Sequence, residues 1–327
     1  MVYIIMNYNI NLKYSEYPMV SVVILNYNGK KYLGDILDNC IKSVLNSSYP
    51  KIEVIIVDNA STDGSIDHLK NIFKNNNKIK YKLLKNNYGM AKGNNEGIKV
   101  SKGDYILLLN SDTFVPRETI EKMVEVMLDN SNIGALGCKI LNPDGSTQST
   151  GEDLRKLFRS ISKNRNDKKS PISGINYVDW IIGAAMMLKK SILQNTGIFY
   201  EYYWAFYEEI DLCYRIKQLD YDVACYLDTT IIHYGNLTAK HFDKWRTDLQ
   251  ERNRMLFHLK NFSWLHAFMV FCLNFLGVIL LLTHQKAQKP PRFYKREWTF
   301  PRQRAKSKLK AFLYINRDAE APYRISS

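Results

Sequence analysis

Three polar segments of this chain each follow an apolar run and carry oxygen-bearing side chains that could bind a cation or a phosphate. Asn110-Ser111-Asp112 comes directly after Tyr105–Leu109, whose unbroken apolar character predicts a strand buried on both faces. Similar segments lie at Asn26–Asn28 and Asp58–Asp63. Ligands of open α/β sheets bind beyond the carboxyl ends of the strands, and hard cations prefer oxygen ligands. Taken alone, Asn110-Ser111-Asp112 favours a turn, because Asn, Ser and Asp are common turn formers.

The elements that must position these residues alternate between strands and helices. Apolar runs predict strands at 20–25, 53–57, 79–84 and 105–109, and helical periodicity predicts helices at 32–45, 65–73 and 116–130. This order is typical of βαβ units, so we expect an α/β fold with a largely parallel sheet. In the second half, a buried strand pair is expected across 177–188, a helix at 207–219 and a strand at 222–232 that ends at His233. The polar stretch 142–173 is expected to be a loop.

Two nucleotide-binding signatures are missing from the sequence. There is no GxGxxG after the first strand and no GxxxxGK[ST] anywhere, which argues against a dinucleotide-dependent dehydrogenase and a P-loop enzyme. The chain offers acidic residues at its strand ends instead. This arrangement would suit a nucleotide site. One carboxylate would face an N–H donor of the nucleotide base, and another would hold a metal ion on the diphosphate.

The positive charge is concentrated at the C-terminus. Of the formal net charge of +14, the segment His284–Ser327 contributes +9, from twelve Lys/Arg and three Asp/Glu. Such a tail favours an anionic partner, either membrane lipid or nucleic acid. The five cysteines are scattered without a CxxC pair, which is typical of a reducing compartment.

Seven segments, in this order, resemble the glycosyltransferases of family two, and most closely the rhamnosyltransferase-like subgroup of polysaccharide and cell-surface glycan synthesis. They are VSVVILNYNG, VDNASTDGS, NNYGMAKGNNEGI, GDYILLLNSDT, VDWIIGAAMML, FYEEIDLCYR and IIHYGN, and the resemblance covers roughly residues 19–261. It implies a GT-A fold and an inverting, metal-dependent transfer of a sugar from a nucleotide donor (a dTDP- or UDP-sugar) to a hydroxyl of a glycan or a lipid-linked acceptor. The resemblance further implies an enzyme of the hexosyltransferase type.

The resemblance also assigns donor-binding residues. Asp58 would contact the base with Tyr27 and Asn28 nearby, and Lys92 and Asn95 would lie around the phosphates. Asn110-Ser111-Asp112 takes the place of the metal-binding DxD motif of the family. Asp112 is then the expected ligand of Mg²⁺ or Mn²⁺, and Asn110, which lacks the charge, is expected near the ribose. His233 corresponds to a histidine that completes the metal shell in some members; a structural histidine is the alternative.

The catalytic base of such enzymes is the second acid of a Glu-Asp pair before a helix, which here reads Glu208-Glu209. Glu209 is therefore expected to take the proton from the acceptor hydroxyl. The alternative is a solvated helix start, where acids are favoured. Glu208 and Trp180 would support the acceptor site, and Asp211 and Arg215 would form an ion pair at i, i+4. The aromatic run 199–204 would be a stacking wall for a sugar or simply core.

The expected organisation is an N-terminal extension (1–18), the GT-A domain (19–240), C-terminal helices (241–283) and the basic tail (284–327). Segment 264–283 has twenty residues without Lys, Arg, Asp or Glu, enough to span a bilayer. A single span would export the basic tail, against the positive-inside tendency. We therefore expect association with the cytoplasmic side of the cell membrane through an anionic surface, with a single span or a buried soluble helix as alternatives.

Three other functions are compatible with parts of the sequence. A nucleotidyltransferase would share the sheet, but no glycine-rich basic loop follows the first strand. A catalytically inactive relative that only binds nucleotide sugars is a second alternative, because Asn110 and Glu209 replace the usual aspartates. A nucleic-acid-binding protein would explain the tail but not the acidic strand ends, so no nucleic-acid partner is expected.

Overall fold

The computed structural model describes residues 17–154, 174–235, 237, 243–263 and individual positions between 265 and 276. Most of the N-terminal extension, much of the 142–173 stretch, most of segment 264–283 and the whole basic tail therefore lie outside the described residues.

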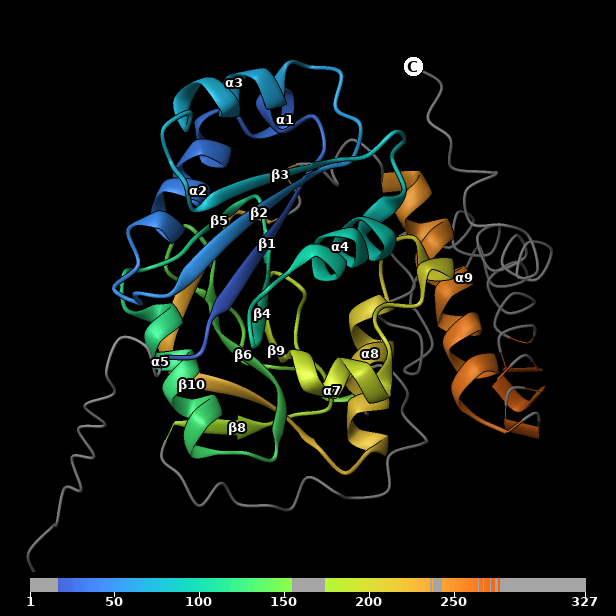
Figure 1. The fold of residues 1–327 in the computed structure, drawn as a ribbon. Coiled ribbons are helices and arrows are strands. Elements are labelled where there is room, and N and C mark those ends of the chain that lie inside the picture. The colour runs from blue at the N-terminus through green and yellow to red at the C-terminus, as the bar shows by residue number, and fades with distance from the viewer. Residues whose placement is uncertain are drawn as a thin grey trace, which may run out of the picture.

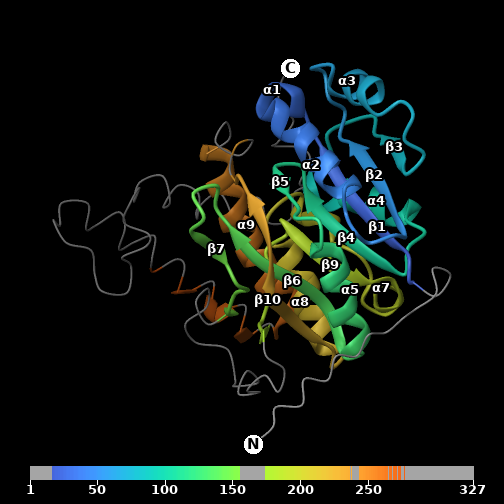
Figure 2. The same cartoon turned by 90° about the vertical axis from the view of Figure 1, so that its left-hand side faces the viewer.

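The described strands form one sheet in the order β3-β2-β1-β4-β9-β6-β10-β5 (Figure 1), with β7 beside β6 (Figure 2) and β8 beside β10. The strands are β1 Val20–Asn26, β2 Ile52–Asp58, β3 Ile79–Leu83, β4 Tyr105–Asn110, β5 Thr113–Phe114, β6 Ile133–Leu141, β7 Thr147–Ser149, β8 Ile175–Tyr177, β9 Ala185–Lys189 and β10 Asp222–His233. The half from β3 to β4 is parallel, as are β6 and β10, and β9 runs antiparallel between these two groups.

Helices cover both faces of this sheet, which confirms the expected α/β class. They are α1 Gly29–Leu33, α2 Asp35–Leu45, α3 Ser65–Ile72, α4 Gly89–Val100, α5 Thr119–Asp129, α7 Lys190–Thr196, α8 Glu208–Gln218 and α9 Asp243–Asn261, with a 3-10 turn, η2, at Glu201–Tyr203. One core joins the sheet to α2, α3 and α5, and a second joins it to α4, α7 and α8. Alternate residues of β1 and β4 belong to the two cores, so these strands are apolar along their length because both faces are buried.

Parallel register aligns the polar strand ends. Asn26 lies opposite Asp58 across the β1–β2 pair, and Leu25 lies opposite Asn110 across the β1–β4 pair. The short strand β5 then turns back and pairs with the end of β10, which sets Thr113 opposite His233 (Figure 2). Residues from three distant parts of the chain therefore meet at one edge of the sheet.

Helix α4 approaches this sheet closely because it has no side chain where it crosses β1. A Cβ added to Gly97 would lie 2.3 Å from a methyl carbon of Val23, and one added to Gly93 would lie 2.6 Å from a methyl carbon of Leu25. The sequence does not predict such closeness from helical periodicity, because a glycine in a helix usually only weakens it.

Three expected elements differ in detail. The helix predicted at 32–45 begins at Gly29 and breaks into α1 and α2 at Gly34, whose φ of 54° is not helical. The strand pair predicted across 177–188 is wrong, because β8 ends at Tyr177 and pairs with β10, whereas β9 begins at Ala185 and inserts between β4 and β6. The polar stretch after Asn142 contains β7, which the sequence prediction had as loop.

Candidate active site

The carboxyl ends of β1 and β2 form a hydrogen-bonded polar cluster centred on Asp58. Its carboxylate accepts from Asn26 Nδ2 at 2.9 Å, from the Ser61 hydroxyl at 2.6 Å and from the Ser61 backbone N–H at 3.0 Å. Asn28, held in the left-handed conformation at φ 49°, accepts from the Thr62 N–H at 2.8 Å. A carboxylate offers about four acceptor positions, so Asp58 retains the capacity for one more donor. Tyr27 lies beside this cluster and is partly exposed.

Asp112 and His233 lie together at the neighbouring strand ends. Asp112 Oδ1 is 3.2 Å from His233 Nε2, and Asn110 Nδ2 is 3.3 Å from the same nitrogen. The Tyr234 N–H donates to the Asp112 carbonyl at 2.9 Å, which fixes the backbone of both residues. The far ring nitrogen, His233 Nδ1, is 2.7 Å from Gln148 Oε1 on β7. One carboxylate, of Asp112, and two amides, of Asn110 and Gln148, thus converge around the imidazole of His233.

Glu208 and Glu209 are adjacent in the first turn of α8, where Glu208 is buried and Glu209 is half-buried. Their Oε2 atoms are enclosed and have no hydrogen-bond partner among the described residues. Burial raises the pKa of Glu209 to about 7. Burial, followed by the charge of Glu209, raises the pKa of Glu208 well above its ordinary range. The raised pKa favours the neutral form of Glu208, and the pKa of Glu209 lies near the pH at which a general base works best.

The loop before α8 is strained. Trp204, Phe206 and Tyr207 have φ values of 64°, 69° and 77°, a conformation that costs roughly 1–3 kcal/mol for each non-glycine residue. Strain of this kind persists only where surrounding contacts over-determine the backbone. It places the Glu208–Glu209 pair at a sharp entry into the helix.

Asn253 of α9 supplies the contacts that hold this loop. Its buried Nδ2 lies 2.8 Å from each of the carbonyl oxygens of Tyr203, Ala205 and Phe206. Its Oδ1 accepts from Arg252 Nη1 at 2.9 Å. From the other side, the Ala91 N–H of α4 donates to the Trp204 carbonyl at 3.0 Å. The loop is thus held between α4 and α9.

Comparisons with known proteins assign the family of this chain. The family model for glycosyl transferase family 2 matches residues 21–195, which is more than half of the 327 residues. The chain belongs to glycosyl transferase family 2. This confirms the family expected from the sequence motifs, and the chain is accordingly a glycosyltransferase.

Individual relatives agree with this assignment. The chain is 36% identical over 113 residues to an uncharacterized glycosyltransferase of Haemophilus influenzae, covering 35% of this chain and 44% of that protein. It is 28% identical over 209 residues to the poly-beta-1,6-N-acetyl-D-glucosamine synthase of Staphylococcus epidermidis, covering 62% and 47% respectively. The chain thus spans less than half the length of both relatives.

Solved structures share the fold. A mannosyltransferase of Pyrobaculum calidifontis in complex with GDP-Man and Mn²⁺ has a TM-score of 0.59 at 16% identity, covering 94% of this chain and 89% of that one. GalNAc-T7 with UDP, GalNAc and Mn²⁺ has a TM-score of 0.55 at 16% identity, covering 66% and 43%. These similarities confirm the GT-A fold.

Not every expected site residue of this glycosyltransferase faces the strand ends. The amide of Asn95 is fully engaged with the loop before α8: it donates to the Phe199 carbonyl at 2.9 Å and to Glu201 at 3.1 Å, and accepts from the Phe199 N–H at 3.0 Å. Asn95 was expected near the phosphates, but this side chain braces the loop instead. Lys92 remains partly exposed, with its ammonium 4.1 Å from the centre of the Tyr88 ring.

The residues around α8 have mostly structural contacts. Asp211 is fully buried and accepts from Arg215 Nε at 2.8 Å, from Lys260 Nζ at 2.9 Å and from Asn261 Nδ2 at 2.8 Å. The expected Asp211–Arg215 ion pair is therefore present, within a larger network. Trp180 packs its partly buried ring between the sheet core and the aromatic cluster of Tyr203 and Phe257.

The aromatic run 199–204 is divided between core and surface. Phe199, Tyr203 and Trp204 are buried, which supports the core alternative for them. Tyr200 is 40% exposed and stacks on Tyr202, with ring centres 5.9 Å apart. Any sugar-stacking surface in this run is confined to these two rings.

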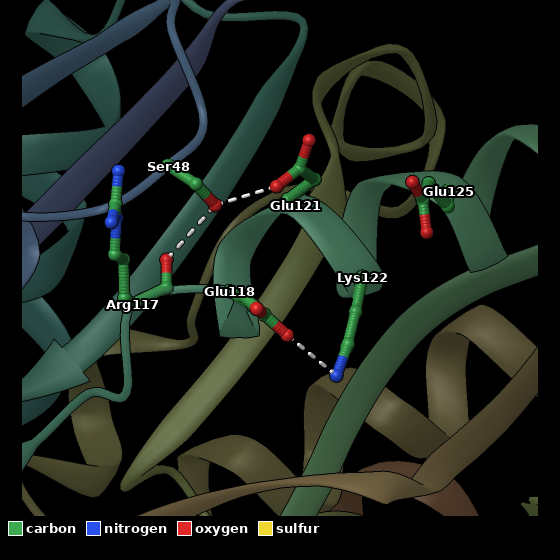
Figure 3. A pocket seen from close by; sticks show the side chains of 6 residues that line it. All are labelled: Ser48, Arg117, Glu118, Glu121, Lys122 and Glu125. Carbon is green, nitrogen blue, oxygen red and sulfur yellow. Dashed lines mark hydrogen bonds and ion pairs between the residues drawn. The ribbon is translucent and has the colours of Figure 1, made fainter.

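A hollow of about 320 Å³ lies elsewhere, lined by Ser48, Arg117, Glu118, Glu121, Lys122 and Glu125 (Figure 3). Ser48 precedes β2, so the hollow lies toward the amino ends of β1 and β2, away from the Asp58 cluster. Its acids are partly neutralised by Lys122, which pairs with Glu118 at 3.0 Å. It therefore adds nothing to the strand-end site.

Sequence reasoning missed Gln148 and Asn253. Gln148 lies in the stretch predicted as a loop, and Asn253 lies in the charged helix predicted near the C-terminus. Neither residue belongs to a motif. The only available signal for Asn253 is that a polar residue falls on a helix face that must be buried.

We expect Asn253→Ala to lower the free energy of unfolding by about 2–4 kcal/mol, because three carbonyl groups lose their buried donor. Urea unfolding followed by circular dichroism measures this change. Asn75→Ala, at an exposed turn position, is the matched control and should change stability by less than about 0.5 kcal/mol. Equal stability of the two variants would show that Asn253 does not hold the loop.

Proposed function

We propose that this glycosyltransferase transfers a sugar from a nucleotide-diphosphate donor to a hydroxyl group of a glycan or lipid-linked acceptor, with inversion and with a divalent metal. The observation that carries the proposal is the 3.2 Å approach of Asp112 Oδ1 and His233 Nε2 beside the Asp58 cluster. The solved relatives with GDP-Man and Mn²⁺ and with UDP and Mn²⁺ support a nucleotide donor and a metal. The resemblance to a poly-beta-1,6-N-acetyl-D-glucosamine synthase supports a glycan acceptor and a role in polysaccharide biosynthesis.

The Asp112–His233 pair fits Mg²⁺ or Mn²⁺. Ligands about 2.1 Å from an octahedral ion lie roughly 3 Å apart at right angles, close to the distance observed. Because His233 Nδ1 faces Gln148 Oε1, a neutral ring turns the lone pair of Nε2 toward the Asp112 carboxylate, so that one cation could bind both groups. Among the described residues no group of three His, Cys, Asp or Glu could hold a metal ion, so the diphosphate and water would complete the shell. The metal, when bound, would stabilise the charge on the departing diphosphate.

The donor nucleotide would lie over the ends of β1 and β2. Asp58 retains one acceptor position for an N–H of the base, with Asn28 and Tyr27 beside it. Asn110 contacts His233 and lies close to where the ribose or the metal would be. Lys92 would supply a positive charge near the phosphates. Asn95 is assigned to the loop and not to the donor.

Glu209 would act as the base for a single displacement. It would take the proton of the acceptor hydroxyl while the hydroxyl oxygen bonds to the anomeric carbon and the bond from that carbon to the diphosphate breaks. The raised pKa of Glu208 favours its neutral form, which would not present a second charge to Glu209. Tyr200 and Tyr202 would form the apolar surface for the acceptor sugar.

Exchange of Glu209 for glutamine should reduce transfer at least about 100-fold, because the amide cannot accept the proton, while donor binding stays nearly unchanged. The assay measures nucleotide release and product formation with a panel of nucleotide sugars and Mn²⁺, and donor binding is followed by thermal shift. Glu118→Gln, at an exposed glutamate of the N-cap of α5, is the matched control. Near-normal transfer by Glu209→Gln would exclude Glu209 as the base, and no turnover of any donor by the unchanged chain would favour the inactive relative.

The pH dependence of transfer should follow the ionisation of Glu209. A base acts in its ionised form, so kcat/KM should rise with pH, reach half of its plateau near pH 7 and fall about tenfold per unit below that, because the pKa of Glu209 is about 7. The measurement is kcat/KM at saturating Mn²⁺ between pH 5 and pH 9, with Glu118→Gln as control. A kcat/KM that stays nearly constant down to pH 5, as the ordinary glutamate pKa of 4.5 would give, would contradict the assignment.

The segment after α9 supports association with an anionic membrane surface on the cytoplasmic side. Leu265, Phe268, Met269, Leu273 and Leu276 are each more than half exposed, and their spacing places them on one helix face. The basic tail His284–Ser327 supplies positive charge nearby in the sequence. Within the described ranges no helix is long and apolar enough to cross a membrane.

The full chain should therefore float with vesicles that contain anionic lipid, and more weakly with neutral vesicles or at high salt. The double variant Phe268→Glu/Leu273→Glu should lose most of this binding. Leu83→Glu/Leu219→Glu, which alters two exposed leucines elsewhere, is the matched control. Equal flotation of both double variants would exclude the helix face as the membrane contact.

A further inference from the structure

A series of hydrogen bonds leads from His233 to a carboxylate at the protein surface. His233 Nδ1 is 2.7 Å from Gln148 Oε1, and Gln148 Nε2 is 2.8 Å from Asn142 Oδ1. Asn142 Nδ2 is 2.9 Å from the Ser146 hydroxyl, and that hydroxyl is 2.6 Å from Asp144 Oδ1. Four polar side chains from β7 and the turn before it thus form a hydrogen-bonded series behind the imidazole, in the order Gln148, Asn142, Ser146 and Asp144.

The direction of every bond in this series is fixed by its last member. The hydroxyl of Ser146, which donates to Asp144, holds the pKa of that carboxyl below its ordinary value, so Asp144 is ionised at neutral pH and can only accept. Ser146 then accepts from the amide nitrogen of Asn142, whose oxygen accepts from Gln148. The Gln148 nitrogen also lies 3.5 Å from the His233 carbonyl, a second acceptor. The oxygen of Gln148 is therefore the atom that faces the imidazole, and it accepts the Nδ1–H.

This orientation determines the state of the opposite ring nitrogen. With Nδ1 protonated, a neutral His233 carries its lone pair on Nε2, the atom that lies beside Asp112. Asn110 Nδ2 can donate to that lone pair, which an aspartate at position 110 could not do. Metal-binding histidines depend on such an outer hydrogen bond to fix the tautomer and the ring orientation.

We propose that Gln148 is a positioning residue that holds His233 in its Nδ1–H tautomer, so that Nε2 is directed to a divalent cation shared with Asp112. The inference rests on the proposed function, since it assigns a supporting residue to the same metal site. Gln148 does not touch the cation. It acts through the orientation of the imidazole, and Asn142, Ser146 and Asp144 keep the Gln148 amide from turning over.

Metal affinity tests the proposal without any sugar donor. The full chain, stripped of metal, is titrated with Mn²⁺ alone, and free Mn²⁺ is followed by electron paramagnetic resonance. Gln148→Leu should weaken binding about 10–100-fold, because the acceptor for Nδ1–H is lost. Gln148→Glu keeps an acceptor oxygen and should bind Mn²⁺ about as well as the unchanged chain. Gln218→Leu, at an exposed glutamine of α8, is the matched control and should have no effect.

The outcomes separate this inference from the proposed function. If the unchanged chain binds Mn²⁺ and Gln148→Leu binds it equally well, the inference is wrong and the metal site stands. If Gln148→Glu loses as much affinity as Gln148→Leu, the acceptor oxygen is not the cause and the inference is also wrong. If the unchanged chain and Asp112→Asn bind Mn²⁺ equally weakly, the metal assignment of the proposed function fails and the inference fails with it.

The tautomer itself gives a second readout that a packing defect would not move. In the metal-free protein labelled with ¹⁵N-histidine, long-range ¹H–¹⁵N correlation should show His233 as the Nδ1–H form, with the signal identified by its absence in His233→Gln. Gln148→Leu should shift His233 toward the Nε2–H form, and Gln148→Glu should not. An Nε2–H pattern in the unchanged protein would overturn the proposal.

Discussion

The antiparallel pairing of β10 with the two-residue strand β5 is the constraint on which the site depends. It pairs His233 with Thr113, the residue after Asp112, although the two are more than a hundred residues apart in the sequence. Without that pairing the end of β10 would not reach the end of β4, because β9 and β6 lie between them in the sheet. The pairing is short, yet it is reinforced by the bond from the Tyr234 N–H to the Asp112 carbonyl. Backbone geometry, rather than attraction between the side chains, thus brings the imidazole to the carboxylate.

A second constraint is the strained entry into α8. Positive φ values at three bulky residues are unfavourable, and they are compensated by buried hydrogen bonds from Asn253 to the carbonyl groups of Tyr203, Ala205 and Phe206. Gly89 allows the loop to approach α4 because it has no side chain. An added Cβ would lie 2.4 Å from the Trp204 carbonyl oxygen. The two glutamates are consequently fixed with one oxygen of each carboxyl group enclosed, which a simple helix start would not provide. Their raised pKa values are a result of this enclosure.

Much of the fold could be predicted from the sequence because its strands are buried on both faces and leave an unambiguous apolar pattern. The polar strand ends at Asp58 and Asp112 followed directly, since parallel strands place their carboxyl ends at one edge. The break at Gly34 and the separate pairing of β8 and β9 could not be predicted, because turn conformation and strand order depend on tertiary packing. Asn95 illustrates the limit well. Its motif pointed to a phosphate, whereas its amide is used up by a loop a hundred residues away, a contact that no local pattern records.

The loop at 199–207 also bears on how this protein could be rebuilt. It is held from one side by Asn95 and Ala91 of α4 and from the other by Asn253 of α9. A chimera that exchanged the C-terminal half for that of a relative would keep the sheet but separate the loop from its partners on α4. The unit that can be transplanted intact is therefore not a contiguous segment. It consists of the loop together with one face of each flanking helix.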